Sequence, residues 1–338
     1  MDHVAVFGIG STNFRSAVAA TDGELLTEPA VEPTRPRDLA DQLVAAVDDL
    51  RGATAQDLDA VAVSTTGLVD DADGAIRRFD TPSGETLDRI ELAEPVDRAH
   101  GLPVTLVNDC NAAALGEWYY GARRDERCLA HLTFGTGIGG GVVEDGRLHR
   151  GENDQAGEFG LLPVAPHEFE STGVAGAWEA VASGRGIPEF VARRLDRDGA
   201  DDESAMDESA APGDAATSGD GSTLDDAPAD PEWFDGAATT AADVFAAADA
   251  GDALAGACLD EVARYDAAGV AAVCNAVDPG LVTLGGGVAL HNPEWIVAGI
   301  EEHLDRYLFV DRPTVRITPL GDDIDLYGAL AAARAEPE

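Results

Sequence analysis

The residues that decide the fold are 128–148, CLAHLTFGTGIGGGVVEDGRL, in which an apolar run enters a glycine-rich turn and a second apolar run leaves it for an Asp-Gly turn. The same order occurs near the start of the chain. There VAVFG (4–8) precedes a glycine turn, FRSAVAAT (14–21) follows it, and Asp22-Gly23 closes the hairpin. Apolar runs bounded by Gly and Asp predict β-strands. A strand–turn–strand unit that recurs in this way indicates a duplicated lobe.

The rest of the chain alternates between helix-like and strand-like patterns. Apolar residues at helical spacing run from Leu39 to Leu50, and a buried-type strand, LDAVAVSTTGLVD, follows at 58–70. Another strand, VTLVND (104–109), leads into an alanine-rich helix. Such alternation is typical of the α/β class. Because 338 residues exceed the size at which one core stops growing, we expect two lobes with a ligand cleft between them.

The alternation suggests limits for the lobes. We place a small lobe at 1–116, a large lobe at 117–310, and a C-terminal segment at 311–338 that returns toward the first lobe. Within the large lobe, an insertion at about 196–235 is rich in Asp, Ala, Gly, Ser and Pro and nearly free of aliphatic residues. Such a composition cannot bury enough apolar surface to fold, so the sequence predicts a disordered acidic insertion. A solvated loop without function is its simplest interpretation.

Charge is the strongest compositional signal. The net charge is −42, and all 22 basic residues are arginine. The acids are spread over nearly every segment, which favours adaptation to a salt-filled cytoplasm over a local patch for a basic partner. Such a surface repels nucleic acid. The chain has no basic leader and no apolar stretch of about 18 residues, so we expect a cytoplasmic protein that does not enter a membrane.

Three glycine-rich turns each follow a β run, at 8–13 (GIGSTN), 135–141 (GTGIGGG) and 285–287 (GGG). Glycine lets the backbone approach phosphate oxygens and direct several N–H groups at them. Glycines also serve plain hairpins, but three such turns in one chain favour nucleotide binding. None matches the P-loop pattern, and the chain has no lysine to complete one. A strand rather than a helix follows GTGIGG, which argues against a Rossmann fingerprint.

Asp109 lies in VNDCN (107–111), where a strand meets a helix. A carboxylate at such a junction can face a ligand in the cleft. Phosphoryl transfer needs one carboxylate to accept the proton of the attacking hydroxyl, and Asp109 fits that role. The alternative is a helix N-cap, in which Asp or Asn accepts backbone N–H bonds. The two roles are compatible.

Two further acids and two histidines are candidate ligands. Glu158 and Glu179 lie near glycine-rich segments and could accept hydrogen bonds from sugar hydroxyls, although single acids are ordinary surface residues in so acidic a chain. His149 and His167 have no partner at metal-ligand spacing, and the four cysteines are scattered without CxxC spacing. We therefore predict no protein metal site at these residues.

The chain resembles the ROK family of sugar kinases and regulators over most of its length apart from the acidic insertion. The motifs that carry the resemblance are, in order, GIGSTNFRSAV, STTGLVD, LVNDCNAAALGEW, FGTGIGGGVVEDGRLHRG, AGEFG and LVTLGGGVAL. It implies the actin-like (ribonuclease H-like) ATPase fold of the α/β class, with ATP, Mg²⁺ and a sugar bound between two lobes, and a homodimer or higher oligomer. It also implies an ATP-dependent kinase for a hexose or N-acetylhexosamine, with glucose the first choice.

Carried over position by position, the resemblance assigns roles to individual residues. It makes Asp109 the general base and gives a backbone role to Gly67. The residues that it implies for sugar hydroxyls are Asn108, Glu158 and Glu179. Those that it implies for ATP are Gly10, Ser11, Thr12 and Asn13 in a first phosphate loop, Thr136 and Gly137 in a second, and Gly285 and Gly286 at the nucleoside.

Three positions depart from the family's motifs. Gly8 stands where the DxGGT motif has an aspartate that helps to hold magnesium, so magnesium must be held by water, by ATP itself or by another acid. Leu161 stands where the ExGH motif has a zinc-ligating histidine, and PHEFESTGVAGAWE (166–179) replaces a cysteine cluster. Zinc is therefore predicted absent. If the charge at residue 8 is not replaced, activity falls by orders of magnitude.

A second hypothesis belongs to another class: a sugar-binding or regulatory protein without catalysis. Gly8 and the altered segment 166–179 motivate it. ROK-type repressors carry an N-terminal helix-turn-helix, for which a glycine turn starting at residue 8 leaves no room, and an acidic surface disfavours DNA. We therefore expect a kinase, with the non-catalytic binder as the alternative and a repressor behind both.

The charge predicts how stability depends on salt. Raising KCl from about 0.1 M to about 1 M shortens the Debye length from about 10 Å to about 3 Å and screens the repulsion among the acids. We expect the melting temperature to rise over that range, measured by circular dichroism. A melting temperature that falls steadily with KCl would contradict this interpretation.

Overall fold

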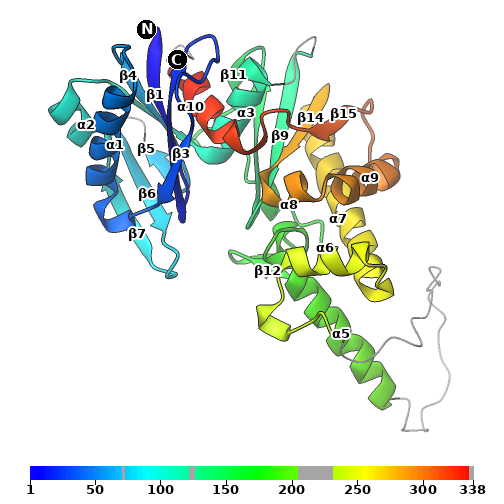
Figure 1. The fold of residues 1–338 in the computed structure, drawn as a ribbon. Helices are drawn as coiled ribbons and strands as arrows, with labels where there is room; N and C mark the ends of the chain where they lie inside the picture. Colours follow the sequence, from blue (N-terminus) through cyan, green and yellow to red (C-terminus); the bar gives the residue numbers. More distant parts are fainter. Residues whose placement is uncertain (71–72, 122–125, 205–230, 335–338) are drawn as a thin grey trace.

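The two hairpins form, and each belongs to a five-stranded sheet (Figure 1). The computed structural model describes residues 1–70, 73–121, 126–204 and 231–334. The first sheet has the order β3 (Ala30–Pro33), β2 (Asn13–Ala20), β1 (His3–Ile9), β4 (Ala60–Thr65) and β8 (Val104–Asn108). The second has the order β11 (Arg147–Leu148), β10 (Ile138–Glu144), β9 (Cys128–Phe134), β14 (Leu281–Gly285) and β15 (Thr314–Ile317).

The two sheets share one topology, which confirms the duplication that the sequence indicates. In the first, β2 is antiparallel to β1, and β4 and β8 are parallel to it. In the second, β10 is antiparallel to β9, and β14 and β15 are parallel to it. The fold is therefore the predicted two-lobed α/β architecture.

Alternation along β1 sends its side chains to two different cores. Phe7 and Ile9 pack with the buried face of α1 (Leu39–Ala53), whereas Val6 packs with α10 (Ile324–Arg334). A helix therefore covers each face of the first sheet. The short α2 (Ala93–His100) joins the α1 side through its one buried residue.

A small sheet extends the first lobe beside β8. The strand predicted at 58–70 is broken, because Gly67 takes a positive φ of 89° and turns the chain from β4 into β5 (Leu68–Asp70). β6 (Ala75–Asp80) and β7 (Thr86–Glu91), which the sequence analysis missed, complete this sheet.

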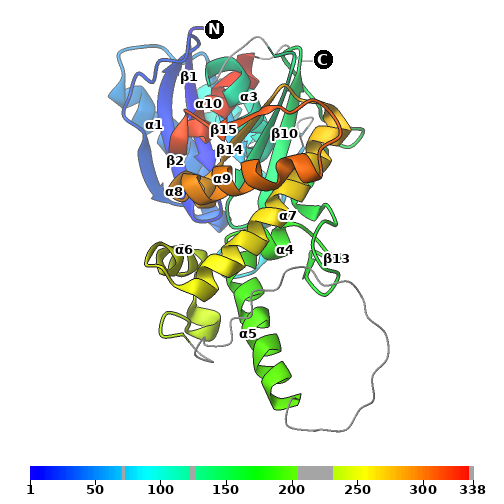
Figure 2. The same cartoon turned by 90° about the vertical axis from the view of Figure 1, so that its right-hand side faces the viewer.

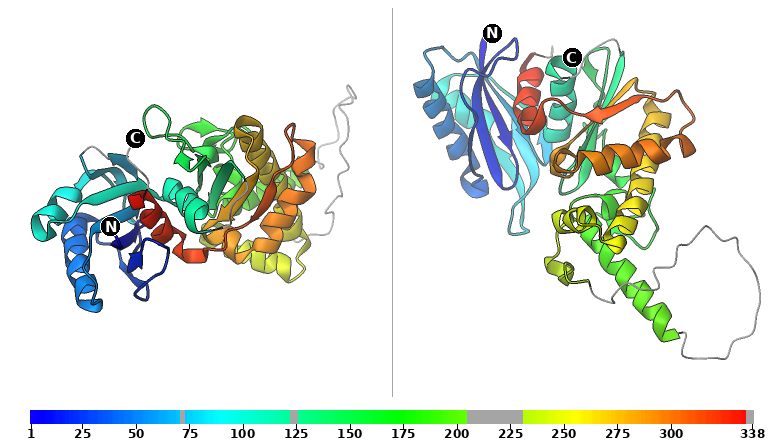
Figure 3. Two further views of the ribbon diagram at one scale, coloured as in Figure 1. Left: turned by 90° about the horizontal axis from the view of Figure 1, so that it is seen from above. Right: turned by 45° about the vertical axis from the view of Figure 1, so that its right-hand side comes forward.

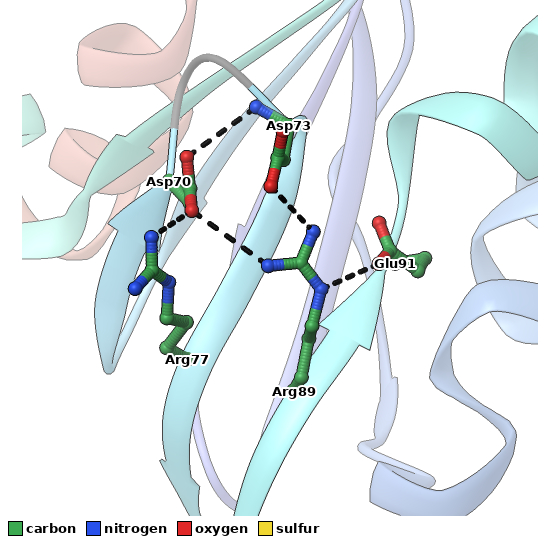
Figure 4. Close-up of polar contacts among 5 residues, drawn as sticks. All are labelled: Asp70, Asp73, Arg77, Arg89 and Glu91. Atoms are coloured by element: carbon green, nitrogen blue, oxygen red, sulfur yellow. Dashed lines mark hydrogen bonds and ion pairs between the residues drawn. The ribbon is translucent and has the colours of Figure 1, made fainter.

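Ion pairs tie the outer surface of the small sheet together (Figure 4). Arg89 donates to Asp73 at 3.0 Å and to Glu91 at 2.5 Å, and Asp70 accepts from Arg77. The hydrogen bond from Arg77 lowers the pKa of Asp70. Pairs exposed to solvent in this way add little stability each, and their number follows from the acidic surface.

Helices cover the outer face of the second sheet, and α7 packs against α9 (Figure 2). The helices of this lobe are α4 (Glu179–Ala182), α5 (Gly186–Ser204), α6 (Ala241–Asp249), α7 (Ala253–Val277), α8 (Gly286–His291) and α9 (Pro293–His303). A two-stranded hairpin, β12 (Glu170–Ser171) and β13 (Val174–Ala175), precedes α4. In the described ranges, no helix combines the length and the hydropathy that a bilayer crossing needs.

The acidic insertion is narrower than predicted at both ends. Residues 196–204 continue α5 as a helix, and Trp233 and Phe234 pack against the core of the large lobe. The prediction of disorder at about 196–235 is wrong for these two stretches, because helix propagation from 186 and two aromatic side chains outweigh the local composition. The remainder, 205–230, lies outside the described residues.

Two helices lie side by side between the sheets (Figure 3). α3 (Asp109–Tyr120) packs on β9 and β10 of the second sheet, and α10 packs on β1 and β4 of the first. The lobe limit placed at 116/117 falls inside α3, and residues 311 onward first contribute β15 to the second sheet. The chain recrosses to the first lobe only with α10, so the C-terminal segment begins later than predicted.

A buried carboxyl group in the second lobe makes stability depend on pH. Asp266 is 1% exposed and accepts a hydrogen bond from Nε1 of the buried Trp178 at 2.8 Å. Burial raises the pKa of Asp266 from 3.8 to about 8. The folded state therefore keeps a proton that the unfolded chain has lost, and this stabilisation declines as the pH rises from about 4 to about 8.

We expect Asp266→Asn to remove this dependence, because asparagine keeps the acceptor for Trp178 and never ionises. Between pH 5 and 8, the free energy of unfolding of the variant should rise relative to that of the native chain by up to about 1.4 kcal/mol per pH unit. The difference in melting temperature between the two proteins should grow in the same direction. Asp260→Asn is the matched control on the same helix, where the side chain is 47% exposed. Parallel pH profiles for Asp266→Asn and the native chain would contradict the assignment.

Candidate active site

The ends of three parallel strands gather the predicted residues at one edge of the first sheet. Ile9, Thr65 and Asn108 are neighbours in the register of β1, β4 and β8. The residues that follow them, Gly10 and Asp109 among others, therefore share this edge. Ligands of open α/β sheets bind at the carboxyl ends of the strands, and here that edge faces the second lobe across α3 and α10.

The helix N-cap and the candidate general base, which the sequence allowed to be one residue, are two neighbouring residues, Asn108 and Asp109. Asn108 is the N-cap of α3, since its Oδ1 accepts from the backbone N–H groups of Cys110 at 3.1 Å and Asn111 at 3.3 Å. Asp109 is the first residue of the helix, and its Oδ1 accepts from the N–H of Cys110 at 2.9 Å. The cap leaves Asp109 free to act on a ligand.

A cavity of about 290 Å³ opens beside this helix N-terminus. Three predicted residues, Gly67, Asn108 and Glu158, line it. Several other lining residues were not predicted from the sequence, chiefly Arg78, Asp80, Asn111, Arg150 and Asp154. The polar groups come from β6, α3 and the segment after β11, so the cavity lies between the small sheet and the second lobe.

Asn111 is the most informative of the missed residues. The residue is 7% exposed, and its Oδ1 has no hydrogen-bond partner among the described residues. A buried acceptor is costly unless a ligand or water satisfies it. Asn111 lies three residues after Asn108 and therefore on the same side of α3. That spacing in the motif NDCN was the signal that could have found it.

The pKa values of Asp109 and Glu158 are each raised in part by the charge of a neighbouring carboxylate. Burial raises the pKa of Asp109, the N–H group of Cys110 opposes the rise, and the charge of Glu158 adds to it. Glu158, although exposed to solvent, has its pKa raised by partial loss of hydration and by the charge of Glu179. A raised pKa suits a general base, because a carboxylate that holds a proton more strongly accepts one more readily.

Glu179 accepts hydrogen bonds from within the protein, and its role toward a sugar hydroxyl stays a prediction. Its Oε2 accepts from the backbone N–H of Ile138 at 3.0 Å, and its Oε1 accepts from Ser171. A Cβ on Gly137 would lie 2.6 Å from the same Oε2. Glu179 is not among the residues that line the first cavity. In this structure it supports the second glycine turn, and its charge contributes to the raised pKa of Glu158.

The first glycine turn is tight and open to solvent. The N–H of Gly10 donates to the carbonyl of Asn13 at 2.9 Å, and Thr34 holds the turn from the side through its hydroxyl, which donates to the Gly10 carbonyl at 2.7 Å. Thr12 and Asn13 are exposed, and Gly10 and Ser11 are partly exposed. The turn is thus accessible to a phosphate group at the same edge as Asp109.

The second and third glycine runs form a second cavity. Gly135, Thr136, Arg185 and Gly287 line it, together with Gly184 and Val288. Of the two residues implied for a nucleoside, Gly285 is buried against His131, and a Cβ on Gly286 would contact the carbonyl of Phe134 at 2.5 Å. Their neighbour Gly287 reaches the cavity instead. Arg185, which the sequence analysis missed, brings a positive charge to it.

The positions that depart from the zinc motif have structural roles instead. Leu161 packs against the core of the large lobe, and 166–179 contains the hairpin β12–β13. Within the described residues, Asp260, Glu302 and His303 have ligand atoms close enough together for a metal ion. They lie on α7 and α9 and line neither cavity. The absence of zinc stays a prediction.

The family model of the ROK family matches residues 5–336. The chain belongs to the ROK family. It is 29% identical to the glucokinase of Streptomyces coelicolor over 98% of this chain and 96% of that protein. It is 31% identical to the glucokinase of Halalkalibacterium halodurans, a match that spans 70% of this chain and 65% of that protein.

A solved structure of the same family supports the fold. The ROK glucokinase of Streptomyces griseus, in complex with glucose and AMPPNP, superposes with a TM-score of 0.71 at 28% identity. The superposition covers 98% of this ROK-family chain and 99% of that protein. The resemblance found in the sequence is thereby confirmed, and the two cavities lie in a fold that carries a sugar and a nucleotide analogue in that relative.

Proposed function

We propose that this ROK-family chain is a sugar kinase that transfers the γ-phosphate of ATP to a hydroxyl of a hexose or N-acetylhexosamine, with glucose the first candidate. The observation that carries the proposal is the position of Asp109. It lies at the N-terminus of α3, next to Asn108 and Asn111, which line the polar first cavity, and at the sheet edge that also holds the first glycine turn.

Each part of the site has a task in this reaction. The sugar occupies the first cavity, where Asn108, Asn111 and Glu158 offer polar groups to its hydroxyls. Asp109 takes the proton of the attacking hydroxyl, and its raised pKa favours that transfer. The glycine turns at 10–13 and 135–137 direct N–H groups at the phosphates, and Arg185 adds a positive charge. Magnesium bound to ATP supplies further neutralisation of the phosphate charge.

A hexose fits the polar lining of the first cavity, but several hexoses share its hydroxyl chemistry, so the sugar follows from a substrate screen. The acidic, lysine-free composition supports a cytoplasm of high salt. A homodimer or higher oligomer follows from the family resemblance.

Asp109→Asn tests the general base. Asparagine can still accept from the N–H of Cys110 but cannot take a proton, so we expect kcat to fall by about 10²- to 10⁴-fold with little change in melting temperature. ADP release in KCl-rich buffer with ATP, Mg²⁺ and glucose measures it. Asp252→Asn, the same change at the N-cap of α7, is the matched control. Unchanged turnover in Asp109→Asn would remove Asp109 as the base.

Asn111→Ala tests the missed cavity residue. The variant loses one hydrogen bond to a sugar hydroxyl, worth about 0.5 to 1.5 kcal/mol, so the KM for sugar should rise by roughly two- to tenfold while the KM for ATP stays constant. Asn275→Ala, at an exposed residue of α7 that bonds to the segment after α9, is the control. An equal rise of both KM values would show a general structural effect instead.

The same assay separates the kinase from a non-catalytic sugar binder. A binder would be stabilised by sugar, since a ligand of the folded state raises the melting temperature, yet would release no ADP. Sugar-dependent ADP release by the native chain, abolished by Asp109→Asn, supports the kinase.

A further inference from the structure

The space that a side chain at residue 8 would fill is taken by a carboxylate from a distant part of the chain. A Cβ added to Gly8 would overlap the carboxyl group of Asp325, with Oδ2 the nearest atom. Asp325 is the second residue of α10, and its side chain is 25% exposed. Only glycine at residue 8 leaves room for this carboxylate, so the two positions are matched.

The position of this carboxylate is fixed by the alternation of β1. Residue 8 points to the same side of the sheet as Val6, which is the α10 side between the lobes. It also lies two residues before Gly10, where the first glycine turn begins. Asp325 therefore places its charge directly below the turn proposed to bind phosphate.

The neighbouring strand β4 and the residue pair that follows it add two unsatisfied hydroxyl groups, those of Ser64 and Thr66. Ser64 of β4 is the register partner of Gly8, so its side chain points to the same face. The hydroxyl oxygens of Ser64 and Thr66 are buried and have no hydrogen-bond partner among the described residues. Buried hydroxyls without partners are expensive, which indicates that a ligand or its water shell completes them.

Arg15 holds the carboxylate by one oxygen. Arg15 is the register partner of Gly8 on β2, and it donates to Oδ1 of Asp325 at 3.1 Å and also pairs with Asp323. Oδ1 accepts from the N–H of Leu326 as well, at 2.8 Å. Both of these hydrogen bonds go to Oδ1, whereas Oδ2 is the atom that lies nearest to Gly8. One oxygen is thus anchored, and the other faces the strand that leads into the first glycine turn.

These groups have the chemistry that a nucleotide-bound magnesium ion needs. Mg²⁺ keeps several water ligands and is held by one or two carboxylates together with the substrate phosphates. Asp109 must stay free to take the sugar proton, and position 8 carries no carboxylate. Asp325 is the carboxylate that lies against the strand just before the first phosphate turn, and Ser64 and Thr66 can bond to metal-bound water.

We propose that Asp325 supplies the carboxylate that holds the magnesium ion of ATP beside the first glycine turn, so that an acid from α10 replaces one at position 8. This inference rests on the proposed kinase function. The alternative is that Asp325 only pairs with Arg15 and favours the N-terminus of α10. That alternative predicts a change in stability and no change in metal binding, so a direct measure of metal binding separates the two.

The experiment measures how strongly metal improves nucleotide binding, independently of turnover. The dissociation constant of AMPPNP is determined by calorimetry with excess Mn²⁺ and with excess EDTA for the native chain and three variants. The variants are Asp325→Asn, the exchange Gly8→Asp with Asp325→Gly, and Asp323→Asn. The last removes another partner of Arg15 without touching Gly8, and thus serves as the matched control.

The gain from Mn²⁺ is the ratio of the AMPPNP dissociation constant in EDTA to that in Mn²⁺. We expect Asp325→Asn to reduce this gain by about 10- to 100-fold, with the dissociation constant in EDTA little changed. The exchange variant should recover most of the gain, because it returns one carboxylate to the same space from the other side, and Asp323→Asn should keep it. An unchanged gain in Asp325→Asn overturns the inference while leaving the kinase intact. If the native chain binds AMPPNP neither with nor without metal, the proposed function itself fails.

Discussion

The close crossing of α3 and α10 is the contact on which the rest of the structure depends. A Cβ on Gly116 would lie 2.8 Å from the backbone nitrogen of Gly328, and a Cβ on Gly328 would overlap the carbonyl group of Ala112. The two helix backbones therefore touch, with no side chain between them. Because α3 is packed on the second sheet and α10 on the first, this contact sets the distance between the lobes. It also brings both N-termini, with Asp109 and Asp325, to the edge where the first glycine turn lies.

The site gathers negative charge in a chain that already carries a net charge of −42. Asp109, Glu158 and Glu179 interact with one another, and burial and mutual repulsion raise the pKa of the first two. A nucleotide adds more negative charge, so nearby cations are needed to stabilise the charge of its phosphates. Arg185 at the second cavity and Arg15 below the first turn lie where such charges are needed. Every protein cation here is an arginine, whose charge does not titrate in the physiological range.

Patterns that are local in sequence were predictable, and contacts between distant segments were not. Alternating apolar runs around glycine turns gave both hairpins, and the motif at 107–111 led to Asp109. The break at Gly67 was missed because one glycine in an apolar run does not reveal its φ. The hydrogen bond from the N–H of Ile138 to Glu179 was not predictable either, because the packing of α4 sets it. Gly287 reaches the second cavity because Gly286 must pack against Phe134, which no spacing shows.

The pairing of Gly8 with Asp325 shows the same limit in its sharpest form. From the sequence, Gly8 is a missing acid, and Asp325 is one of 64 acids in an acidic chain. Only the fold brings them together, because α10 follows the second lobe in the sequence and packs against the face of β1 that carries Val6. A function that depends on one charge at one point in space requires that charge, but not its attachment to a particular strand. A residue that departs from a motif therefore weakens a functional assignment only when no other side chain reaches the vacated position, and here Asp325 reaches it.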